Sequence, residues 1–560
     1  MRVTFPAGLA FALVLTFTAA AQAMESARVS MFEPDWDAAA AAVPDRPDGP
    51  VQDIFARLNA AAAQRFPGIA VSPVPVLLPF DIAAALKAKA AGKDADKTDG
   101  VVAAGFRPSK FFLPGPAGYD ATFFIKSSEV SGLGIKYPKP VEVEIAGAVF
   151  AYDLDDPNIV ESTHTPRALT DEFPGIRRIL REAHARYSFT RFGVPYVVSI
   201  ECFNGRVTAK RLSCKDADLV AVRFLNALQV AGGTPTRQIS PPRVDLTRPT
   251  VKSMSFSYHS AGSLIPNSGY KTFGGRADNH VYARIRFPIS GTPAFAVSQS
   301  FMHWGDCYMK GKIGRTNRKG APYRCKLNDK QLVFDESAPE NFSYPWRDNF
   351  CETRDTQVGQ CPGGTGHQGQ DIRPASCVLN NEGADRCEPY QHDVVAVRDG
   401  MIWRNTADYV VYESVYVVVN TANERVRFRY MHMDPKRMDT DGIASGRRVR
   451  QGEVIGQVGN YNKKENGTSY HLHFDTQVWT QDGWVWVNPY MTLVSAYERL
   501  IGARGAEIKD GEARPVAVPG IPPQIKVATP VAEQNAAPAP KKQHRQGRRK
   551  FRKSNDDDAG

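Results

Sequence analysis

Glycine and proline recur along the whole chain and constrain its fold more than any other feature. The 560 residues include 45 Gly and 40 Pro. Both residues interrupt regular structure, so long helices and coiled coils are disfavoured and short strands joined by turns are expected. The length exceeds what one hydrophobic core serves, which predicts three or four units of about 150 residues each. Hydrophobic residues at 42% and charged residues at 23% lie in the globular range and exclude a wholly disordered or collagen-like protein.

The N-terminus has the pattern of a secretory signal peptide. Arg2 precedes an apolar run from Ala7 to Ala20, and residues 21–23 form a small-x-small cleavage site. The run is shorter than the roughly 20 residues that a membrane span needs, so we expect residues 1–23 to be removed rather than kept as an anchor. No later window is apolar enough to span a bilayer. We therefore expect a periplasmic or secreted mature chain without a transmembrane segment.

Eight cysteines follow this segment, and an even number of cysteines in an exported chain predicts disulfide bonds. Eight cysteines allow about a hundred pairings, so the spacing alone does not fix the connectivity. Consecutive cysteines would close short loops, and we expect local bridges at 202–214, 307–325, 351–361 and 377–387. The alternative, a structural zinc site, would need closely spaced C-x₂₋₄-C pairs, which the chain lacks.

Periodicity divides the first half of the mature chain. Residues 24–70 are expected to form an Ala/Pro-rich leader with one helix over 51–66. Residues 71–245 are expected to form a β-rich domain of unknown function, with helices at 176–183 and 216–230. Its predicted strands lie at 74–80, 111–113, 121–125, 141–145 and 194–203.

The second half begins with a linker at 246–281 and continues with another series of short strands over 282–500. The tail, 505–560, is Ala/Pro-rich and basic, and we expect it to be disordered. The formal net charge of the whole chain is +11, which favours an anionic partner such as nucleic acid, a membrane surface or a cell-wall polymer. Export argues against nucleic acid. The sequence says nothing of the oligomeric state.

Two fragments of the second half carry residues suited to metal chemistry. The segment 366–371 places His367 and Asp371 four residues apart in a loop, with a glycine between them that would let both side chains turn toward one point. The segment 427–432, Arg-Phe-Arg-Tyr-Met-His, alternates and predicts a strand that ends at His432.

A third fragment, His471-Leu-His473-Phe-Asp475, also predicts a strand. Residues two apart share a face, so both histidines would project together while Leu472 and Phe474 face the opposite layer. Imidazoles about 7 Å apart along a strand do not easily bind one ion. We expect one of the two to coordinate and the other to stay close by.

Together these fragments resemble the lysostaphin-type zinc metallopeptidases, which cut peptidoglycan cross-bridges. The resemblance rests on their order, on the Tyr two residues before His432 and on the Gly-rich runs between them, and it covers about Tyr282 to Tyr497. Supporting segments lie at 394–400, 449–459 and 487–490. The implied fold class is mainly β: an antiparallel-sheet zinc metallopeptidase domain, preceded by a β-rich α+β N-terminal domain and followed by a disordered basic tail.

The resemblance implies that His367, Asp371 and His473 bind Zn²⁺ and that His432 and His471 are catalytic histidines that do not coordinate it. Three N or O ligands leave the fourth tetrahedral position open for water, as in catalytic zinc sites. Zinc lowers the pKa of that water toward about 7, and a neighbouring histidine can move a proton. Which of His432 and His471 is the general base stays open.

We therefore expect an exported zinc-dependent endopeptidase in which zinc-bound water attacks peptide bonds of peptidoglycan stems or cross-links. The alternative is a non-enzymatic wall-binding or amidase-activating scaffold of the same fold, as in relatives that have lost zinc ligands, whereas this chain has all five positions. Cross-links between D-Ala and a diamino acid are preferred over glycine bridges. The family's usual Glu is replaced by Asp475, and 461–470 replaces a run of small residues, so the substrate groove need not keep the family's shape.

Other aromatic and histidine side chains have a structural interpretation. Trp479, Trp484 and Trp486 could stack on sugars, but tryptophans at this spacing near a terminal strand more often belong to the core. His303 and His392 are likewise expected to be structural.

Overall fold

The computed structural model describes most of residues 24–509. The described ranges are 24–92, 103–154, 165–203, 211–235, 240–264, 275–291, 293–296, 344–374 without 353 and 355, 389–404, 424–509 without 463, 466 and 469, and the backbone of short strands at 308–309, 312–313, 324–327, 330–333 and 416–420. The signal-peptide prediction at 1–23 and the tail beyond 509 lie outside these ranges. Within them, no helix combines the length and the apolar character that crossing a membrane requires.

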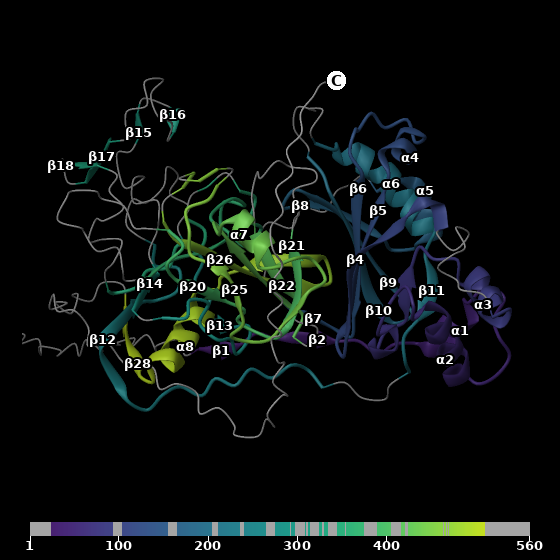
Figure 1. The fold of residues 1–560 in the computed structure, drawn as a ribbon, viewed down its shortest axis with the longest axis horizontal. Coiled ribbons are helices and arrows are strands. Elements are labelled where there is room, and N and C mark those ends of the chain that lie inside the picture. The colour runs from purple at the N-terminus through teal and green to yellow at the C-terminus, as the bar shows by residue number, and fades with distance from the viewer. Residues whose placement is uncertain are drawn as a thin grey trace, which may run out of the picture. The chain divides into compact units, whose positions relative to one another are not determined.

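The N-terminal domain is built on a six-stranded antiparallel sheet with the order β4-β5-β6-β10-β9-β8 (Figure 1). Its strands are β4 (Arg107–Gly115), β5 (Gly118–Ile125), β6 (Val141–Ala148), β8 (Arg177–Arg181), β9 (His184–Arg191) and β10 (Val194–Glu201). Helix α6 (Cys214–Asn226) packs on β9 and β10, and the Ser213 side chain caps its N-terminus. The β-rich α+β prediction for this domain is confirmed.

Smaller elements complete this domain. They are α3 (Ile82–Ala90), α4 (Ser127–Ser131), α5 (Arg167–Glu172), the short 3₁₀ turns η1 (Ile69–Val71) and η4 (Ala103–Gly105), and the strand pair β3 (Val76–Leu78) and β11 (Gln229–Gly232). The Cys202–Cys214 disulfide joins the end of β10 to the start of α6, as predicted.

The segment 24–70 is not a leader, because it is packed into the fold. Strand β1 (Glu25–Ser26) pairs with β13 (His280–Val281), and β2 (Val29–Met31) pairs with β7 (Phe150–Tyr152). Two helices follow, α1 (Trp36–Ala41) and α2 (Val51–Ala62). The predicted apolar face of α2 is buried, and it carries Ile54, Phe55 and Leu58. The Ala/Pro-rich composition therefore did not predict that this segment is folded.

The helix predicted at 176–183 is wrong, since residues 177–181 form strand β8. Strands β8 and β9 make a hairpin in which Arg181 pairs with His184, so only Glu182 and Ala183 form the turn. Both turn residues have positive φ, 51° and 59°. Two-residue turns of this kind usually use Gly, Asn or Asp, and without that signal the apolar spacing imitated a helix.

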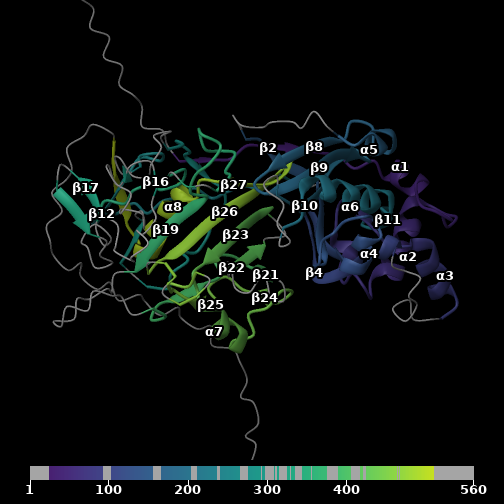
Figure 2. The same ribbon diagram turned by 90° about the horizontal axis from the view of Figure 1, so that it is seen from above.

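The second domain contains an eight-stranded sheet. Its path is β14-β19-β26-β23-β22-β21-β24, β27 pairs with β26, and all the pairs are antiparallel. From above, β19, β26, β23, β22 and β21 lie in this order (Figure 2). The strands are β14 (Ala294–Ala296), β19 (Gly369–Pro374), β21 (Gly400–Arg404), β22 (Tyr416–Asn420), β23 (Val426–Met431), β24 (Arg448–Val449), β26 (Leu472–Thr480) and β27 (Gly483–Val487).

Other elements of the second domain are two helices and three strand pairs. They are α7 (Pro435–Thr440), α8 (Tyr490–Ile501), β20 (Asp393–Val395) with β25 (Val454–Gln457), β15 (Tyr308–Met309) with β16 (Lys312–Ile313), and β17 (Arg324–Leu327) with β18 (Lys330–Val333). The predicted bridge Cys351–Cys361 is present. The predicted bridges 307–325 and 377–387 involve side chains outside the described residues.

The predicted linker and the predicted start of the tail both need correction. Strand β12 (Lys252–His259) lies within the linker range and pairs in parallel with β28 (Arg504–Ile508), whose residues after Arg504 lie within the tail range. Arg248, just before β12, also binds the carboxylate of Glu498 on α8. Its Nε lies 2.8 Å from Oε2, and its Nη2 lies 2.5 Å from Oε1. Strands β12 and β28, which flank the second domain in the sequence, therefore pair with each other and belong to its fold.

The two sheets meet in a buried, charged interface within a single compact unit of the chain. Asp120 of β5 is 2% exposed and contacts Arg425 at 2.5 Å and Arg427 at 3.3 Å. Trp484 Nε1 donates to the same carboxylate, and the Arg427 guanidinium lies 3.9 Å from the centre of the Trp484 ring. Trp479, Trp484 and Trp486 are all buried, so their core interpretation is confirmed.

Candidate metal centre

The pairing of β19 with β26 places a carboxylate and an imidazole side by side. Asp371 of β19 lies directly opposite His473 of β26, and the Asp371 Oδ1 to His473 Nδ1 distance is 3.2 Å. His367 lies in the loop just before β19, and its Nε2 is 3.3 Å from Asp371 Oδ1 and 2.9 Å from His473 Nδ1. The prediction that one loop carries both His367 and Asp371 is therefore half correct, because Asp371 is on a strand.

Gly369 has a different role from the one predicted. A Cβ at this position would lie 2.5 Å from Phe474 O and 2.6 Å from Asp475 Cβ. The glycine therefore permits β19 to approach β26 closely, rather than supplying a turn. This close approach is what brings Asp371 within reach of His473.

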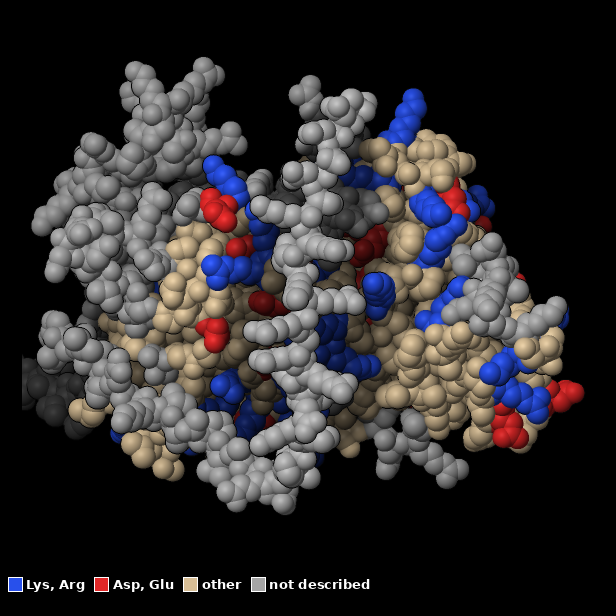
Figure 3. Space-filling model, in the orientation of Figure 1, with Lys and Arg blue, Asp and Glu red and all other residues tan. Residues whose placement is uncertain are grey.

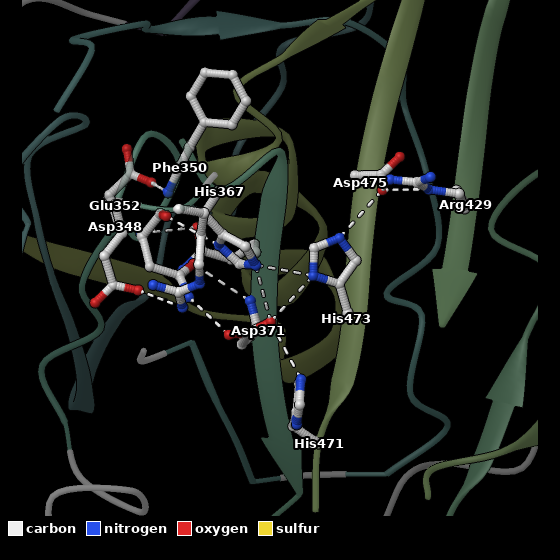
Figure 4. Close-up of polar contacts among 12 residues, drawn as sticks. Asp348, Phe350, Glu352, His367, Asp371, Arg429, His471, His473 and Asp475 are labelled. Atoms are coloured by element: carbon white, nitrogen blue, oxygen red, sulfur yellow. Dashed lines mark hydrogen bonds and ion pairs between the residues drawn. The ribbon is translucent and has the colours of Figure 1, made fainter. Parts of the chain in front are cut away.

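The three donor atoms fit a tetrahedral zinc ion. One ligand atom each from His367, Asp371 and His473 lies within 4.8 Å of the other two, and all three residues are buried (Figure 4). Ligands about 2.0–2.2 Å from zinc occupy tetrahedron corners roughly 3.3–3.6 Å apart, close to the separations of 2.9–3.3 Å between these donors. Two imidazoles and one carboxylate are also a donor set typical of catalytic zinc.

His471 and His432 lie beside these donors. His471 Nε2 is 3.4 Å from Asp371 Oδ1, so His471 and His473 face the same carboxylate, as the strand alternation predicts. Leu472 and Phe474 are fully buried on the other side of β26. The His432 ring centre is 4.6 Å from that of His471 and 6.2 Å from that of His473.

The backbone at His432 departs from the predicted strand. Strand β23 ends at Met431, and His432 has a φ of 73°, a left-handed conformation that is uncommon for residues other than glycine. Its Nδ1 is 2.8 Å from the carbonyl oxygen of Tyr461. Because a carbonyl only accepts, Nδ1 carries the proton and Nε2 keeps a lone pair. Burial, together with the nearby His473, lowers the pKa of His432 to about 4.

Asp475 and Arg429 support His473 on the side of its ring that faces away from Asp371. Asp475 Oδ2 is 3.1 Å from His473 Nε2, the ring nitrogen opposite the one that faces Asp371. Arg429, across the strand on β23, contacts the same oxygen through Nε at 2.6 Å and Nη2 at 2.5 Å. Although burial opposes it, Arg429 lowers the pKa of Asp475, and hydrogen bonds to Asp371 and Asp475 raise the pKa of His473 against the effect of burial.

The loop before β19 fixes His367. His367 Nδ1 is 3.0 Å from Asn349 O, its backbone N donates to Glu352 O, and its carbonyl accepts from Cys351 N. A Cβ at Gly366 would lie 2.8 Å from Cys351 Cα and 2.9 Å from Cys361 Sγ, so the disulfide packs directly against this loop. Burial opposes ionisation of Asp371, but His367 and His471 lower the pKa of its carboxyl well below the ordinary value.

A comparison with protein families gives a match to the model "Peptidase family M23" over residues 380–489. Residues 380–489 are a peptidase family M23 domain. The match includes His432, His471 and His473, but it begins after His367 and Asp371. The place of these two residues in the site of the M23 domain therefore rests on the pairing of β19 with β26.

A solved structure described as a candidate glycyl-glycine endopeptidase, lytM, from Ruminococcus gnavus matches with 22% identity, covering 25% of this chain and 49% of that chain, so the match spans about half of that protein. Its TM-score of 0.17 is too low to carry an argument about structure. No curated protein matches the chain.

The structure thus brings together all five residues predicted for the site of the M23 domain. The roles of Arg429 and Asn349 were missed. Arg427 and Arg429 lie two residues apart on β23, so their side chains share one face of the sheet. This spacing could have predicted that Arg429 lies on the same face of the sheet as Asp475 of β26. Nothing in the sequence around Asn349 distinguishes it from an ordinary loop residue.

Asp475 offers a test of this support. Replacing Asp475 with Ala is expected to weaken zinc binding about 10- to 100-fold, because His473 loses the acceptor that orients its ring and Arg429 loses its carboxylate. Competition with a chelating dye measures the zinc affinity. Asp475→Glu, which keeps the carboxylate, is the control and should retain most of the affinity; equal zinc affinity in Asp475→Ala and the unmodified chain would contradict the assignment.

Proposed function

We propose that this chain is an exported zinc-dependent endopeptidase that hydrolyses peptide bonds in peptidoglycan stem peptides or cross-links. The observation that carries the proposal is the convergence of His367, Asp371 and His473 beside two further histidines, at the edge of an M23 domain. The M23 match supports a peptidase activity, and the metal, the substrate and the compartment are proposed together with it.

His367 Nε2, Asp371 Oδ1 and His473 Nδ1 would hold the ion. Zinc bound there would polarise the scissile carbonyl and make water nucleophilic near neutral pH. The protein's own contribution is to fix these donors: Asp475 orients His473, and Asn349 O accepts the Nδ1 proton of His367, which leaves Nε2 available to the metal.

His432 is the better candidate for the general base. Tyr461 O fixes its tautomer so that the Nε2 lone pair is free to accept a proton, and burial keeps the ring neutral until it does so. His471 contacts Asp371 instead, which suits it to stabilise charge beside the ligand carboxylate or to donate to a developing oxyanion. This assignment divides the two roles that the sequence left open.

Several features support a cell-wall substrate. The sequence resembles the lysostaphin-type enzymes in all five site positions, the N-terminus has a signal-peptide pattern, and the net charge of +11 suits an anionic polymer. On the face drawn in Figure 3, Lys and Arg form blue patches across the described surface. Cross-links between D-Ala and a diamino acid remain our preferred bond, and glycine bridges the alternative.

Digestion of purified peptidoglycan, followed by mass analysis of the soluble fragments, tests the proposal. We expect zinc-dependent release of fragments with new peptide termini, lost on chelation and restored by zinc. Their masses would identify the bond. Wall binding without release of any fragment, by chain that contains zinc, would favour the non-enzymatic scaffold and contradict the proposal.

The environment of His432 predicts a pH dependence. A histidine whose pKa lies near 4 is neutral at every pH above about 5, so its protonation should not limit the rate between pH 5 and 8. A titration of ¹³C-labelled histidine rings by NMR, with His432→Gln to assign the signal, measures this pKa directly. A midpoint near the ordinary value of 6.5 would show that the ring is not buried as described.

A further inference from the structure

A cavity separate from the metal centre is lined by arginines. Its volume is about 330 Å³, at the lower end of the range for small-ligand sites. Four of its lining residues are Arg284, Arg286, Arg398 and Arg499, and none belongs to the metal centre. Four guanidinium groups from three segments of the sequence therefore line one space.

The walls of this cavity are held by hydrogen bonds. Arg286 N donates to Val397 O at 3.0 Å, and Gln451 Nε2 donates to the same carbonyl at 2.8 Å. Arg499, in the last turn of α8, donates from Nη2 to Ile285 O at 2.9 Å. The segments around 285, 397 and 451 are thus joined to one another and to α8, so the cavity is a built feature of the fold.

The positive charge around the cavity is only partly compensated. Arg284 pairs with Asp245, and Arg398 pairs with Glu424. In the part of the chain that the structure describes, neither Arg286 nor Arg499 contacts a carboxylate. Asp399 lies near Arg398 and offsets some of the charge, but its Oδ1 accepts from Gln451 N. Among the described residues, two guanidinium groups of the cavity therefore have no carboxylate in direct contact, while Glu498 offsets part of the charge of Arg499 without contacting it.

The crowding of these cations has an electrostatic cost. Burial lowers the pKa of Arg398 and of Arg499, and in both cases the nearby Arg284 lowers it further. A group whose charged form is destabilised by its neighbours gains from a bound anion, because the anion relieves the repulsion. The charges around the cavity therefore favour the binding of an anion.

We propose that this cavity binds the phosphate group of a phosphate ester. Arginine forks bind phosphate oxygens in pairs, and the two guanidinium groups without carboxylate partners among the described residues match a phosphate dianion better than a single carboxylate. Leu500 also lines the cavity and provides an apolar surface for the carbon part of the ester. The phosphate could belong to a free small ester or to a phosphate-containing polymer. This proposal is independent of the peptidase proposal.

Isothermal titration of the full chain tests the site with inorganic phosphate, glycerol 3-phosphate and poly(glycerol phosphate) as probes. Arg286→Ala is the decisive variant, because this exposed side chain has no carboxylate partner in the described residues and its loss should not disturb the fold. We expect phosphate binding to weaken roughly tenfold or more, as for loss of a charge-assisted hydrogen bond, and Arg286→Lys to lose less.

The matched control is Arg57→Ala, which removes the same charge from an exposed position of α2 and should leave binding unchanged. Binding of the small ester supports a free ligand, and Arg286-dependent binding of the polymer alone supports a polymeric one. Three results would overturn the proposal: no saturable binding of any phosphate probe, equal weakening by Arg286→Ala and Arg57→Ala, or competition by acetate as strong as that by phosphate.

Discussion

Replacing Asp371 with alanine is expected to abolish zinc binding and peptidase activity together. Asp371 Oδ1 is the donor common to the short contacts with His367 and His473, and it comes from the middle of a paired strand. Without it two imidazoles remain, and two ligands hold zinc far more weakly than three. Metal analysis of the purified variant and the rate of fragment release from peptidoglycan measure the two effects.

His432→Ala and His471→Ala should behave differently from this variant. Both should keep zinc while turnover falls about 10²-fold or more, the scale typical of general acid–base groups. Neither His432 nor His471 belongs to the close donor group, and His471 faces the Asp371 carboxylate from outside it. If His471→Ala loses zinc as completely as Asp371→Ala, or if His432→Ala stays fully active, the division of these residues into ligands and catalysts is wrong.

Replacing Asp120 with alanine is expected to lower the free energy of unfolding by about 3–5 kcal/mol, the range for removing one partner from a buried ion pair. The carboxylate is 2% exposed and faces Arg425 and Arg427, whose side chains are 1% and 8% exposed. Its loss would leave Arg425 without its carboxylate partner and Arg427 with Glu144 alone. Trp484 would lose its acceptor as well.

Chemical denaturation of the two proteins measures this difference. Asp45→Ala is the matched control, because Asp45 pairs with Lys87 in solvent, with side chains 64% and 76% exposed, and such pairs contribute at most about 1 kcal/mol. An Asp120→Ala chain as stable as the Asp45→Ala chain would show that the two sheets do not depend on this interface.

The sequence predicted that these five residues would lie close together because its signals are local. A period of two places His471 and His473 on one face, and His367 and Asp371 lie only four residues apart in one short segment. What it did not predict depends on partners far along the chain: the pairing of Asp371 with His473, and the contact between Arg429 and Asp475. Strand pairing is set by the whole sheet, so no short window contains it.

The errors in the fold have the same origin. The 182–183 turn lacks the residues that usually mark a two-residue hairpin, and strands β12 and β28 are stabilised by each other rather than by their own composition. The interface around Asp120 was equally invisible, because Arg425 and Arg427 look like ordinary surface charges until the second sheet is placed against them.

The pairing of β12 with β28 has a consequence for the order in which the protein can mature. Ser260, next to β12, contacts Glu507 of β28 across 247 residues of sequence. During synthesis β12 therefore emerges long before its partner exists, and its edge stays open until residue 508 has been made. The nascent second domain must wait for its final strand, whereas the N-terminal sheet, complete by residue 201, can assemble first. A chain that stops at Arg504 would lack nearly all of β28, so β12 would keep an unpaired edge.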